Sequence, residues 1–559
     1  MPPTITEPSS DEAAGPTDQP RAWWSIDAPG AWGAVALGCL SMTPSLLPRG
    51  GVTQGIVAGI SAAIGYGLGL LLAATWRAIA DRDPRPNTLG AWRWFGVVAF
   101  ITVLGVIVLG EHWQTRLRTL MGMPPDPSWR TLLLLSVAVV VFAVILSVSR
   151  TLRTASRRLT RLLQRRIGPR AARTLGWVVV TLVTYLLLTG VLLDASIAAA
   201  DRAFSLRDTS TQEGVEPTQN VLRSGGPGSL VPWDSLGRQG RNFTTRGPSA
   251  ADIAALWDGF AAEPIRAYAG MATADDVEER ARLAVDDLAR AGGFDRDHLL
   301  VATTTGTGWL DPGTMASFEY LTRGDSAIVT MQYSYLPSWL SYLVDQRRAR
   351  EAGRELFDAV YERWSLMPPT QRPQLYVFGE SLGSFGAEAA FSGEFDLRNR
   401  TDGALFVGAP NFNPLHREFT EGRDAGSRQI EPVVRDGRTV RFANEVSAGI
   451  EPATRAWDGT RVLYLQHPSD PIVWWSPELL TRRPDWLSEP RGRDVLDQMI
   501  WLPFITFWQV TADLPFAVDL PPGHGHRYTT ESVDAWAAIL QPPGWTETQA
   551  DVLRREISG

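Results

Sequence analysis

The chain has 559 residues, which is more than one domain usually holds, so at least two parts are expected. Its net charge of −7 argues against nucleic acid as a general partner, and all 53 basic residues are arginine. The single cysteine, Cys39, excludes an intramolecular disulfide and a cysteine-rich metal site. Long apolar runs are confined to the part of the chain before residue 200, and the rest has the composition of a globular domain.

Residues 1–27 are rich in Pro, Ser, Thr and acidic side chains, a composition that predicts a disordered tail. Five apolar runs follow, each close to the ~20 residues that cross a bilayer core. They are 30–47, 52–75, 92–110, 131–149 and 175–193. Tryptophans lie at or near their ends, as in an aromatic belt. The sequence therefore predicts a transmembrane domain of about five helices over residues 28–198, with Pro44 interrupting the first run.

The second apolar run carries glycines at regular spacing. Gly55 and Gly59, and then Gly65 and Gly69, lie four residues apart and so share a helix face. Small residues on one face let helices approach closely in lipid. Glycine is frequent in this chain, which is the alternative explanation, but five glycines within one run would otherwise weaken the helix. We expect close packing of this helix against its neighbours.

The connection between the fourth and fifth runs, residues 150–173, carries nine arginines and no acidic residue. Loops of this kind remain in the cytoplasm. Alternation of the runs then places everything after about residue 195 outside the cytoplasmic membrane. The arginines could instead form a patch for nucleic acid or anionic lipid, but their position between two spans favours the topological interpretation. The sequence predicts a multi-pass protein of the cell membrane whose second half is extracytoplasmic.

The second half alternates between helical and strand patterns. Residues 199–250 are polar with Gly and Pro, which predicts an extended linker, and residues 251–559 form the second domain. Its predicted strands are 298–303, 326–332, 375–378, 403–407 and 461–466, and its predicted helices are 276–291, 350–363 and 531–540. This alternation predicts an α/β fold with a mostly parallel sheet and helices on both faces. Residues 412–455 lack the pattern and are the candidate for a lid or cap.

The second domain is organised around the segment 375–390. Four apolar residues run into Gly379-Glu-Ser381-Leu-Gly383, and a helical stretch of small residues follows. The motif alone is weak evidence, because a glycine-rich turn at a strand end looks the same, but a strand before it and a helix after it are typical of a nucleophile elbow. There the serine hydroxyl lies at a helix N-terminus, where backbone N–H groups stabilise an oxyanion. Ser381 is the candidate nucleophile.

A serine nucleophile needs a histidine base held by a carboxylate, and in α/β-hydrolases the chain order is Ser, acid, His. The acid belongs in a loop after a later strand, and Asp470 follows the predicted strand 461–466. The alternative for Asp470 is a turn residue that bonds its own backbone. Of the six histidines, only His524 and His526 come after Asp470 and before a terminal helix. His526 is favoured because Tyr528 follows it by two positions, and His524 remains the alternative base.

Two further features complete the candidate site. The two histidines could instead bind a metal, but no companion carboxylate is obvious nearby. The oxyanion hole requires one N–H from the residue after the nucleophile, Leu382, and one from an earlier loop. The loop 301–309 supplies Gly306 or Thr307. A phosphate-binding loop is excluded because no lysine is present. We expect neither a cofactor nor a metal.

Several motifs of this chain resemble those of the actinobacterial α/β-hydrolases that carry an N-terminal multi-helix membrane domain. Besides the Ser381 segment they are Thr43-Pro-Ser-Leu-Leu-Pro-Arg49, Thr305-Gly-Thr-Gly-Trp309, Gln332-Tyr-Ser-Tyr-Leu-Pro-Ser-Trp339 and Pro522-Gly-His-Gly-His-Arg-Tyr528. The resemblance spans most of the chain. It implies the α/β-hydrolase fold preceded by a transmembrane bundle, and a Ser-Asp-His triad, without indicating a substrate.

Three functions are consistent with this pattern. The first is a membrane-anchored serine hydrolase, esterase- or lipase-like, that acts through an acyl-enzyme on acyl esters of envelope lipids. The second is an acyltransferase that passes the acyl group to a lipid or glycan hydroxyl. The third is a non-catalytic membrane protein that binds a partner or senses a ligand, which the ordered triad disfavours. The expected partners are a lipid or acyl-ester substrate and membrane lipids, and Trp474 and Trp475 either line an acyl groove or belong to the core.

Overall fold

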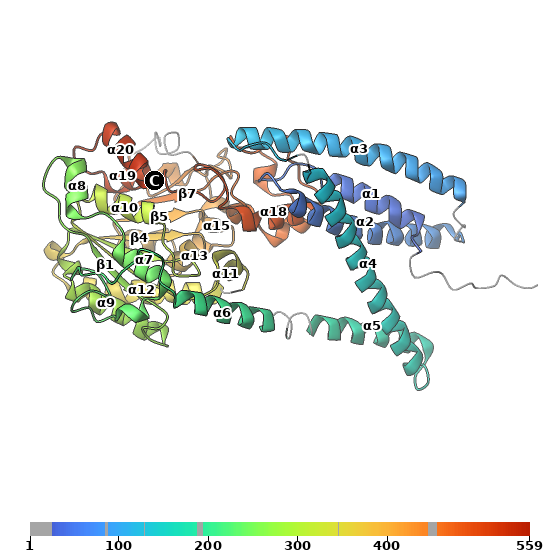
Figure 1. Ribbon diagram of the computed structural model, residues 1–559, viewed down its shortest axis with the longest axis horizontal. Coiled ribbons are helices and arrows are strands. Elements are labelled where there is room, and N and C mark those ends of the chain that lie inside the picture. The colour runs from blue at the N-terminus through green and yellow to red at the C-terminus, as the bar shows by residue number, and fades with distance from the viewer. Residues whose placement is uncertain are drawn as a thin grey trace, which may run out of the picture.

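The computed structural model describes residues 25–83, 88–127, 129–186, 190, 194–344, 346–444 and 456–558. A helical part is followed by an α/β domain (Figure 1). The helices of the first part are α1 (Ala28–Leu40), α2 (Gly51–Ala80), α3 (Leu89–Leu120), α4 (Arg130–Leu163), α5 (Pro169–Leu186) and α6 (Asp194–Asp208). Residues 1–24 of the predicted tail lie outside the described residues.

Three of the described helices, α2, α3 and α4, are long and apolar enough to cross a membrane. They have 30, 32 and 34 residues, which at ~1.5 Å per residue exceeds the ~30 Å core of a bilayer. Most of their large apolar side chains are exposed, as they are in helices that face lipid. The second, third and fourth predicted spans correspond to these helices.

The first predicted span differs from the structure. The helix α1 has only 13 residues and ends at Leu40, so alone it is shorter than a bilayer core. The chain leaves the helix because the hydroxyl of Thr43 bonds the carbonyl of Leu40 and Pro44 follows. The fifth predicted span, 175–193, includes α5 up to Leu186, and the rest of it falls mainly outside the described residues.

The glycines of α2 pack as expected. A Cβ added at Gly55 would lie 2.7 Å from the carbonyl oxygen of Leu134 on α4, and one at Gly59 would meet α4 at the same distance. A Cβ at Gly65 would lie 2.1 Å from the carbonyl oxygen of Gly33 on α1. The two glycine pairs therefore contact two different helices, α4 and α1, and any larger residue would push those backbones apart.

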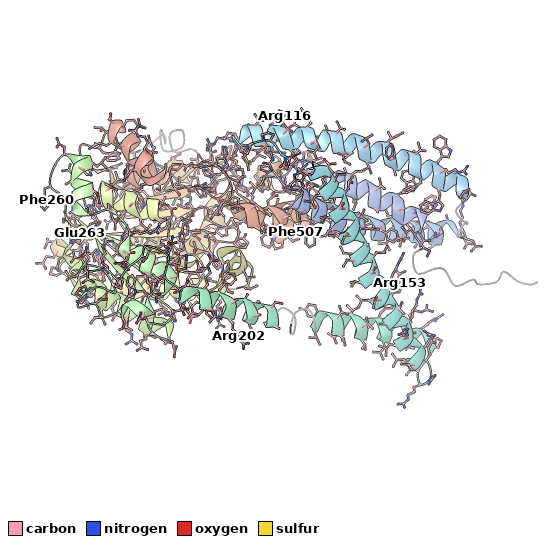
Figure 2. The ribbon with its side chains drawn as sticks, in the orientation of Figure 1. Arg116, Arg153, Arg202, Phe260, Glu263 and Phe507 are labelled. Atoms are coloured by element: carbon pink, nitrogen blue, oxygen red, sulfur yellow. The ribbon has the colours of Figure 1, made fainter. Side chains whose placement is uncertain are left out.

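The helical part has two distinct ends. The loops 41–50 and 121–127 lie beside the α/β domain, whereas the C-terminal end of α2 and the arginine-rich end of α4 lie away from it (Figure 1). Figure 2 shows Arg153 on the distant part of α4 and Arg116 near the end of α3 that adjoins the α/β domain. The helix α5 turns back along α4, and α6 leads into the α/β domain.

The α/β domain is built on a seven-stranded parallel sheet of order β1-β3-β2-β4-β5-β7-β6. The strands are β1 (Ile265–Ala269), β2 (His298–Thr303), β3 (Ser326–Met331), β4 (Gln374–Glu380), β5 (Gly403–Val407), β6 (Val440–Ala443) and β7 (Arg461–Leu465). The helices are α7 (Gly237–Thr245), α8 (Ala250–Trp257), α9 (Val277–Arg290), α10 (Pro312–Leu321), α11 (Ser338–Val344), α12 (Gln346–Leu366), α13 (Leu382–Glu388), α14 (Glu394–Arg400), α15 (Pro414–Glu421), α17 (Pro471–Trp474), α18 (Ile505–Asp513), α19 (Ser532–Leu540) and α20 (Glu547–Ser558).

Both faces of the sheet are buried, which explains why its strands are nearly continuous apolar runs. In β2, Leu299 and Val301 face the core formed with α9, α12 and α13. Leu300 and Ala302 face the opposite core, formed with α10, α19 and α7. The predicted fold class is confirmed, and the predicted strands 298–303 and 403–407 have the expected bounds.

Two edge regions of the domain are not apparent from the sequence. Strand β1 carries Arg266 at its second position, a residue that argues against a buried strand, yet its guanidinium is buried and bonded to both carboxylate oxygens of Glu319 at 2.7 and 2.5 Å. The segment 199–250 is not an extended linker. It contains α7, and Val231 and Leu236 are fully buried in the core against Tyr268.

The segment 412–455, the candidate for a lid or cap, does not have the expected role in its described part. Residues 412–444 form α15, which packs beside α13, and the edge strand β6. His416 in α15 is buried and bonded to Gln466 at 2.8 Å. Residues 445–455 lie outside the described residues. The described part of 412–455 thus extends the sheet and its flank.

The contact between the loop 41–49 and α18 joins the two parts of the chain, and we call it the junction. Arg49 and Asp513 form an ion pair of 3.0 Å with both side chains buried. The hydroxyl of Ser45 donates to Asp513 at 2.5 Å, and the amide of Gln509 donates to the carbonyl of Thr43 at 2.8 Å. Figure 2 shows Phe507 of α18 where the α/β domain meets the helices. The Thr43–Arg49 motif is therefore a docking loop.

An apolar cluster surrounds the polar contacts of the junction. Leu46 and Leu47 of the loop and Leu117 of α3 pack with residues of the α/β domain that include Trp474, Trp486, Met499 and Val510. Trp474 is 1 % exposed and contacts the ring of Trp486. Trp474 is therefore a core residue of the junction, as the second of the two alternatives for it predicts. Trp475 is partly buried beside Phe507.

Candidate active site

Ser381 lies on a sharp turn between β4 and α13. Its φ of 55° and ψ of −129° place it in a region that non-glycine residues rarely adopt. A Cβ at Gly379 would lie 2.6 Å from the carbonyl oxygen of Gly383, and one at Gly383 would lie 2.4 Å from that of Thr303. Both glycines are therefore required for this turn, and the predicted strand–turn–helix geometry is present.

Asp470 and His526 come together although 56 residues separate them. The Nδ1 of His526 lies 2.6 Å from Oδ2 of Asp470, which is fully buried. Oδ1 of Asp470 accepts from the N–H of Ile472 at 2.8 Å, and the hydroxyl of Tyr528 donates to Oδ2 at 2.7 Å. The carboxylate is thus oriented by three partners, as it must be to hold an imidazole in one tautomer.

The other ring nitrogen of His526, Nε2, is buried and has no hydrogen-bond partner among the described residues. The ring lies against Gly408, where an added Cβ would be 2.3 Å from Cε1. Burial lowers the pKa of His526, but the charge of Asp470 and the hydrogen bond to it outweigh burial, so that the pKa is raised. The imidazole is therefore oriented by Asp470 and keeps Nε2 available as a base.

His524 occupies a different hydrogen-bond network. Its Nδ1 lies 3.1 Å from Oδ2 of Asp494, which also accepts from the hydroxyl of Ser469 at 2.5 Å. That hydroxyl accepts from the N–H of Gly525 at 2.9 Å. The structure therefore places His526, and not His524, beside Asp470, and the two histidines bond separate carboxylates. Within the described ranges, no group of three or more His, Cys, Asp or Glu is placed to hold a metal ion.

The loop after β2 approaches the elbow closely. Gly383 contacts the carbonyl oxygens of Thr303 and Thr304, so the start of α13 and the start of this loop touch. Leu382 is the first residue of α13, and its N–H has no partner within the helix. Thr307 lines the same cavity as Ser381, whereas Gly306 packs against Ser341 and Leu336. Of the two predicted loop donors, Thr307 is the one that the structure places at the cavity.

Comparison with known proteins agrees with this geometry. A model described as an alpha/beta-hydrolase family matches residues 265–553, and a model of the N-terminus of an alpha/beta-hydrolase family matches residues 42–248. The chain belongs to an α/β-hydrolase family. No curated protein and no solved structure gives a significant match. Membership of the family supports a hydrolase-type function.

The candidate site opens into a cavity of about 450 Å³. The residues that line it include Ser381, His526, Thr305, Thr307, Trp309, Asp311, Glu380, Arg527 and Thr529. None of its lining residues belongs to 412–444. The described part of the predicted cap therefore does not cover Ser381. The cavity is instead bounded by the loop after β2 and by the segment around His526.

Two acidic residues of this cavity are absent from the site predicted by the sequence. Glu380 lies within the Gly379–Gly383 motif and directly precedes the nucleophile, so the sequence alone could have identified it as a residue of the site. Asp311 caps the N-terminus of α10, where Oδ1 accepts from the N–H of Thr314 at 2.7 Å. Its Oδ2 accepts from the hydroxyl of Thr529 at 3.0 Å. An N-capping aspartate is common, so nothing in the sequence singles out Asp311.

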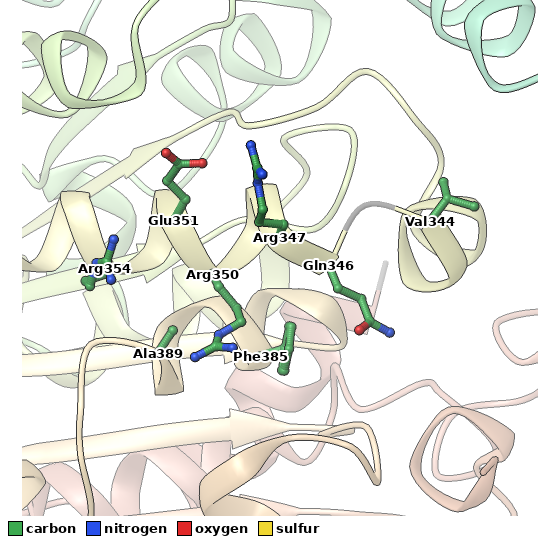
Figure 3. A pocket seen from close by; sticks show the side chains of 8 residues that line it. All are labelled: Val344, Gln346, Arg347, Arg350, Glu351, Arg354, Phe385 and Ala389. Carbon is green, nitrogen blue, oxygen red and sulfur yellow. The ribbon is translucent and has the colours of Figure 1, made fainter. Parts of the chain in front are cut away.

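A larger cavity of about 730 Å³ lies between α12 and α13 (Figure 3). Arg347, Arg350 and Arg354 line one side, and Arg350 extends toward Phe385 of α13 and toward Ala389, which follows that helix. None of the residues assigned to this cavity belongs to the candidate triad. The candidate chemistry therefore belongs to the smaller cavity at Ser381.

Proposed function

We propose that this protein is a membrane-anchored serine hydrolase in which Ser381 is the nucleophile, His526 the base and Asp470 the acid. One observation carries the proposal. The imidazole of His526 is bonded to a buried carboxylate through Nδ1, has an Nε2 without a partner among the described residues, and lines one cavity with Ser381 at a strained turn. This is the arrangement that a serine needs in order to become nucleophilic.

The reaction would proceed through an acyl-enzyme. The Oγ of Ser381 attacks the ester carbonyl carbon while Nε2 of His526 takes the hydroxyl proton. The oxyanion accepts hydrogen bonds from the N–H groups of Leu382 and of Thr307 or Gly306. Collapse of this intermediate breaks the bond between the carbonyl carbon and the alcohol oxygen, and His526 gives its proton to the leaving alcohol. The acyl group remains on Ser381.

The second half of the reaction decides between hydrolase and acyltransferase. Water, or a hydroxyl of a lipid or glycan, gives its proton to His526 and attacks the acyl carbon. The bond to Ser381 then breaks, and the serine regains its proton. The product is a free acid in the first case and a new ester in the second. Exclusion of water from the cavity would favour transfer.

The substrate class is proposed from the position of the site. Three long apolar helices and the docked loop 41–49 tie the α/β domain to a membrane, and the arginine-rich end of α4 lies away from that domain. Arginine-rich loops stay in the cytoplasm, so we place the α/β domain on the outer side. Acyl esters of envelope lipids are therefore the proposed substrates, presented at the outer leaflet.

Covalent labelling tests the nucleophile. A fluorophosphonate probe should label the wild-type protein in detergent micelles, fail to label Ser381→Ala, and still label Ser392→Ala, in which an exposed serine beyond α13 is removed. A mutant Ser381→Ala that is labelled like the wild type would remove Ser381 from the mechanism. No labelling of any variant would favour a binding or sensing protein with a hydrolase fold.

A panel of esters tests the substrate class. We expect faster cleavage of a long-chain p-nitrophenyl ester in micelles than of p-nitrophenyl acetate, and release of fatty acid from a lipid extract of the native envelope. A strong preference for the acetyl ester would contradict the lipid proposal. Acyl product on an added alcohol, in place of free acid, would identify an acyltransferase.

A further inference from the structure

The cavity at Ser381 is lined mainly by residues with hydrogen-bonding side chains. Val518 is the only aliphatic residue among the twelve that line it. Hydrogen-bonding side chains dominate the rest, and Trp309 adds a flat aromatic surface. Binding sites for apolar ligands are lined mainly by apolar and aromatic side chains with few polar groups. The part of the substrate that occupies this cavity should therefore be rich in hydrogen-bonding groups.

Glu380 is, besides the base His526, the residue of this cavity that has a buried side-chain atom without a hydrogen-bond partner among the described residues. Its side chain is largely buried, with the residue 7 % exposed, and Oε2 has no partner among the described residues. Asp311 in the same cavity is instead bonded to Thr314 and Thr529. A buried polar atom without a partner costs free energy, so its retention beside the nucleophile points to a partner supplied by a ligand.

The protonation state of Glu380 indicates what kind of partner fits. Burial, and then the nearby charge of Asp311, raise the pKa of Glu380 to about 8. At neutral pH the side chain is therefore mostly a neutral carboxylic acid, which offers one O–H donor and acceptor capacity. An alcohol hydroxyl is likewise both donor and acceptor, so the two groups can pair in both directions. A cationic ligand would first have to displace the proton of Glu380, whereas a hydroxyl pairs with the neutral acid directly.

The positions of these groups indicate that they contact the alcohol part of the ester substrate. His526 delivers a proton to the leaving alcohol, which must therefore lie on the His526 side of the cavity. Arg527 and Thr529 follow His526 in the chain, and Thr529 bonds Asp311. We propose that this cavity binds the alcohol part of the substrate as a polyhydroxylated group such as a sugar, and that Glu380 pairs with one of its hydroxyls.

This inference rests on the proposed function and narrows it to acyl esters of glycan or polyol head groups. It applies equally to an acyltransferase, because the acceptor hydroxyl would occupy the same side of the cavity. A site built to bond a substrate hydroxyl discriminates strongly against an analogue that lacks it, because its own polar groups are then left unpaired. Glu380 is thus a specificity-determining residue.

Competition between two esters measures this specificity directly. An octanoyl ester of glucose and ethyl octanoate are mixed in the same detergent micelles, and the ratio of their kcat/KM values is obtained from the two products. Wild-type protein should favour the sugar ester by at least ~10-fold, the effect of one well-placed hydrogen bond. Glu380→Met should reduce this ratio by about 10- to 100-fold for the same reason.

The pH dependence of the same ratio separates binding by Glu380 from a structural effect. The groups that face Glu380 are Asp311, His526 and Asp470, and Arg527 shares the cavity. Protonation of His526 affects both esters alike and cancels in the ratio. Above about pH 8 the ionised Glu380 accepts a charge-assisted hydrogen bond from a sugar hydroxyl and is more costly to leave unpaired, so the preference of the wild type for the sugar ester should rise. In Glu380→Gln the amide does not titrate, and the ratio should stay constant with pH.

Glu388 provides the matched control. It is another buried glutamate of the same region with a raised pKa, of about 7, but its oxygens are bonded to Asn413, Leu415 and Tyr464 and it does not line the cavity. Glu388→Gln should keep the wild-type ratio and its rise above about pH 8. Each variant is compared at an equal fluorophosphonate-labelled fraction, so that loss of folded protein does not alter the result.

The outcomes distinguish the two levels of the proposal. Labelled wild-type protein that shows no preference for the sugar ester, or Glu380→Met that keeps the wild-type ratio, would overturn this inference alone. A ratio that changes at alkaline pH as much in Glu380→Gln as in the wild type, or a wild-type ratio that does not rise, would do the same. Absence of both labelling and ester cleavage would overturn the proposed function, and this inference with it.

Discussion

The buried ion pair of the junction allows a quantitative prediction. Arg49 and Asp513 are 1 % and 0 % exposed and 3.0 Å apart. Removing one member, as in Arg49→Met or Asp513→Leu, leaves the other charge buried without its counter-charge, and such a change costs about 3–5 kcal/mol. In the double variant neither charge remains, and apolar replacements of buried pairs are often close to neutral. The double variant should therefore lie within about 2 kcal/mol of the wild type.

Urea unfolding in detergent micelles measures these free energies, with tryptophan fluorescence as the probe because Trp474 and Trp486 lie in the junction. The four proteins form a double-mutant cycle, from which we expect a coupling energy of at least ~3 kcal/mol. Arg363 and Asp286, an exposed pair 3.5 Å apart, are the control, and their coupling should stay below ~0.5 kcal/mol. The reasoning would be refuted if the free energy of unfolding of the single variants at the junction fell by less than ~1 kcal/mol. It would also be refuted if the effects of the two substitutions simply added in the double variant.

Three further predictions concern the triad and the topology. Asp470→Asn should lose about 10⁴-fold in kcat. Its remaining activity should persist to lower pH, because the carboxylate that raises the pKa of His526 is gone. A loss of kcat under ~10-fold would show that another residue is the acid of the triad. His526→Ala should lose more activity than His524→Ala, which keeps the Asp470 pair intact, and the reverse order would exchange the two histidines. Reporter fusions at residue 160 should indicate the cytoplasm and at residue 240 the exterior, and one compartment for both would contradict the topology.

The parts of the fold that the sequence reveals are those encoded by neighbouring residues. The strand, the two glycines and the small-residue helix around Ser381 form a continuous local pattern, and the structure has that turn. Strand β2 is recognisable for the same reason, since its apolar residues are continuous. The order of Ser381, Asp470 and His526 also follows the known order of such triads, so the pair Asp470–His526 could be expected before its geometry was seen.

The parts that the sequence does not reveal depend on contacts between distant residues. Arg266 makes β1 look unlike a strand because Glu319, its buried partner, is 53 residues away. Trp474 looks like a candidate for a groove because the cluster that buries it includes Leu46 and Leu117 of the helical part. In the same way nothing local indicates that the loop after α1 is docked on α18, because the partner of Ser45 lies 468 residues later. These contacts lie between segments that no local pattern relates.

The junction also determines how this protein can be divided. Asp470 is followed directly by α17, whose Trp474 packs in the junction, and the N–H of His526 donates to the carbonyl of Ala517, shortly after Asp513 in the chain. A fragment that begins at residue 251 would expose the apolar residues Val473 and Met499 to water and leave Asp513 without its cation. Expressed alone, such a fragment should aggregate. A chimera that exchanges the helical part between relatives would therefore have to exchange α18 with it.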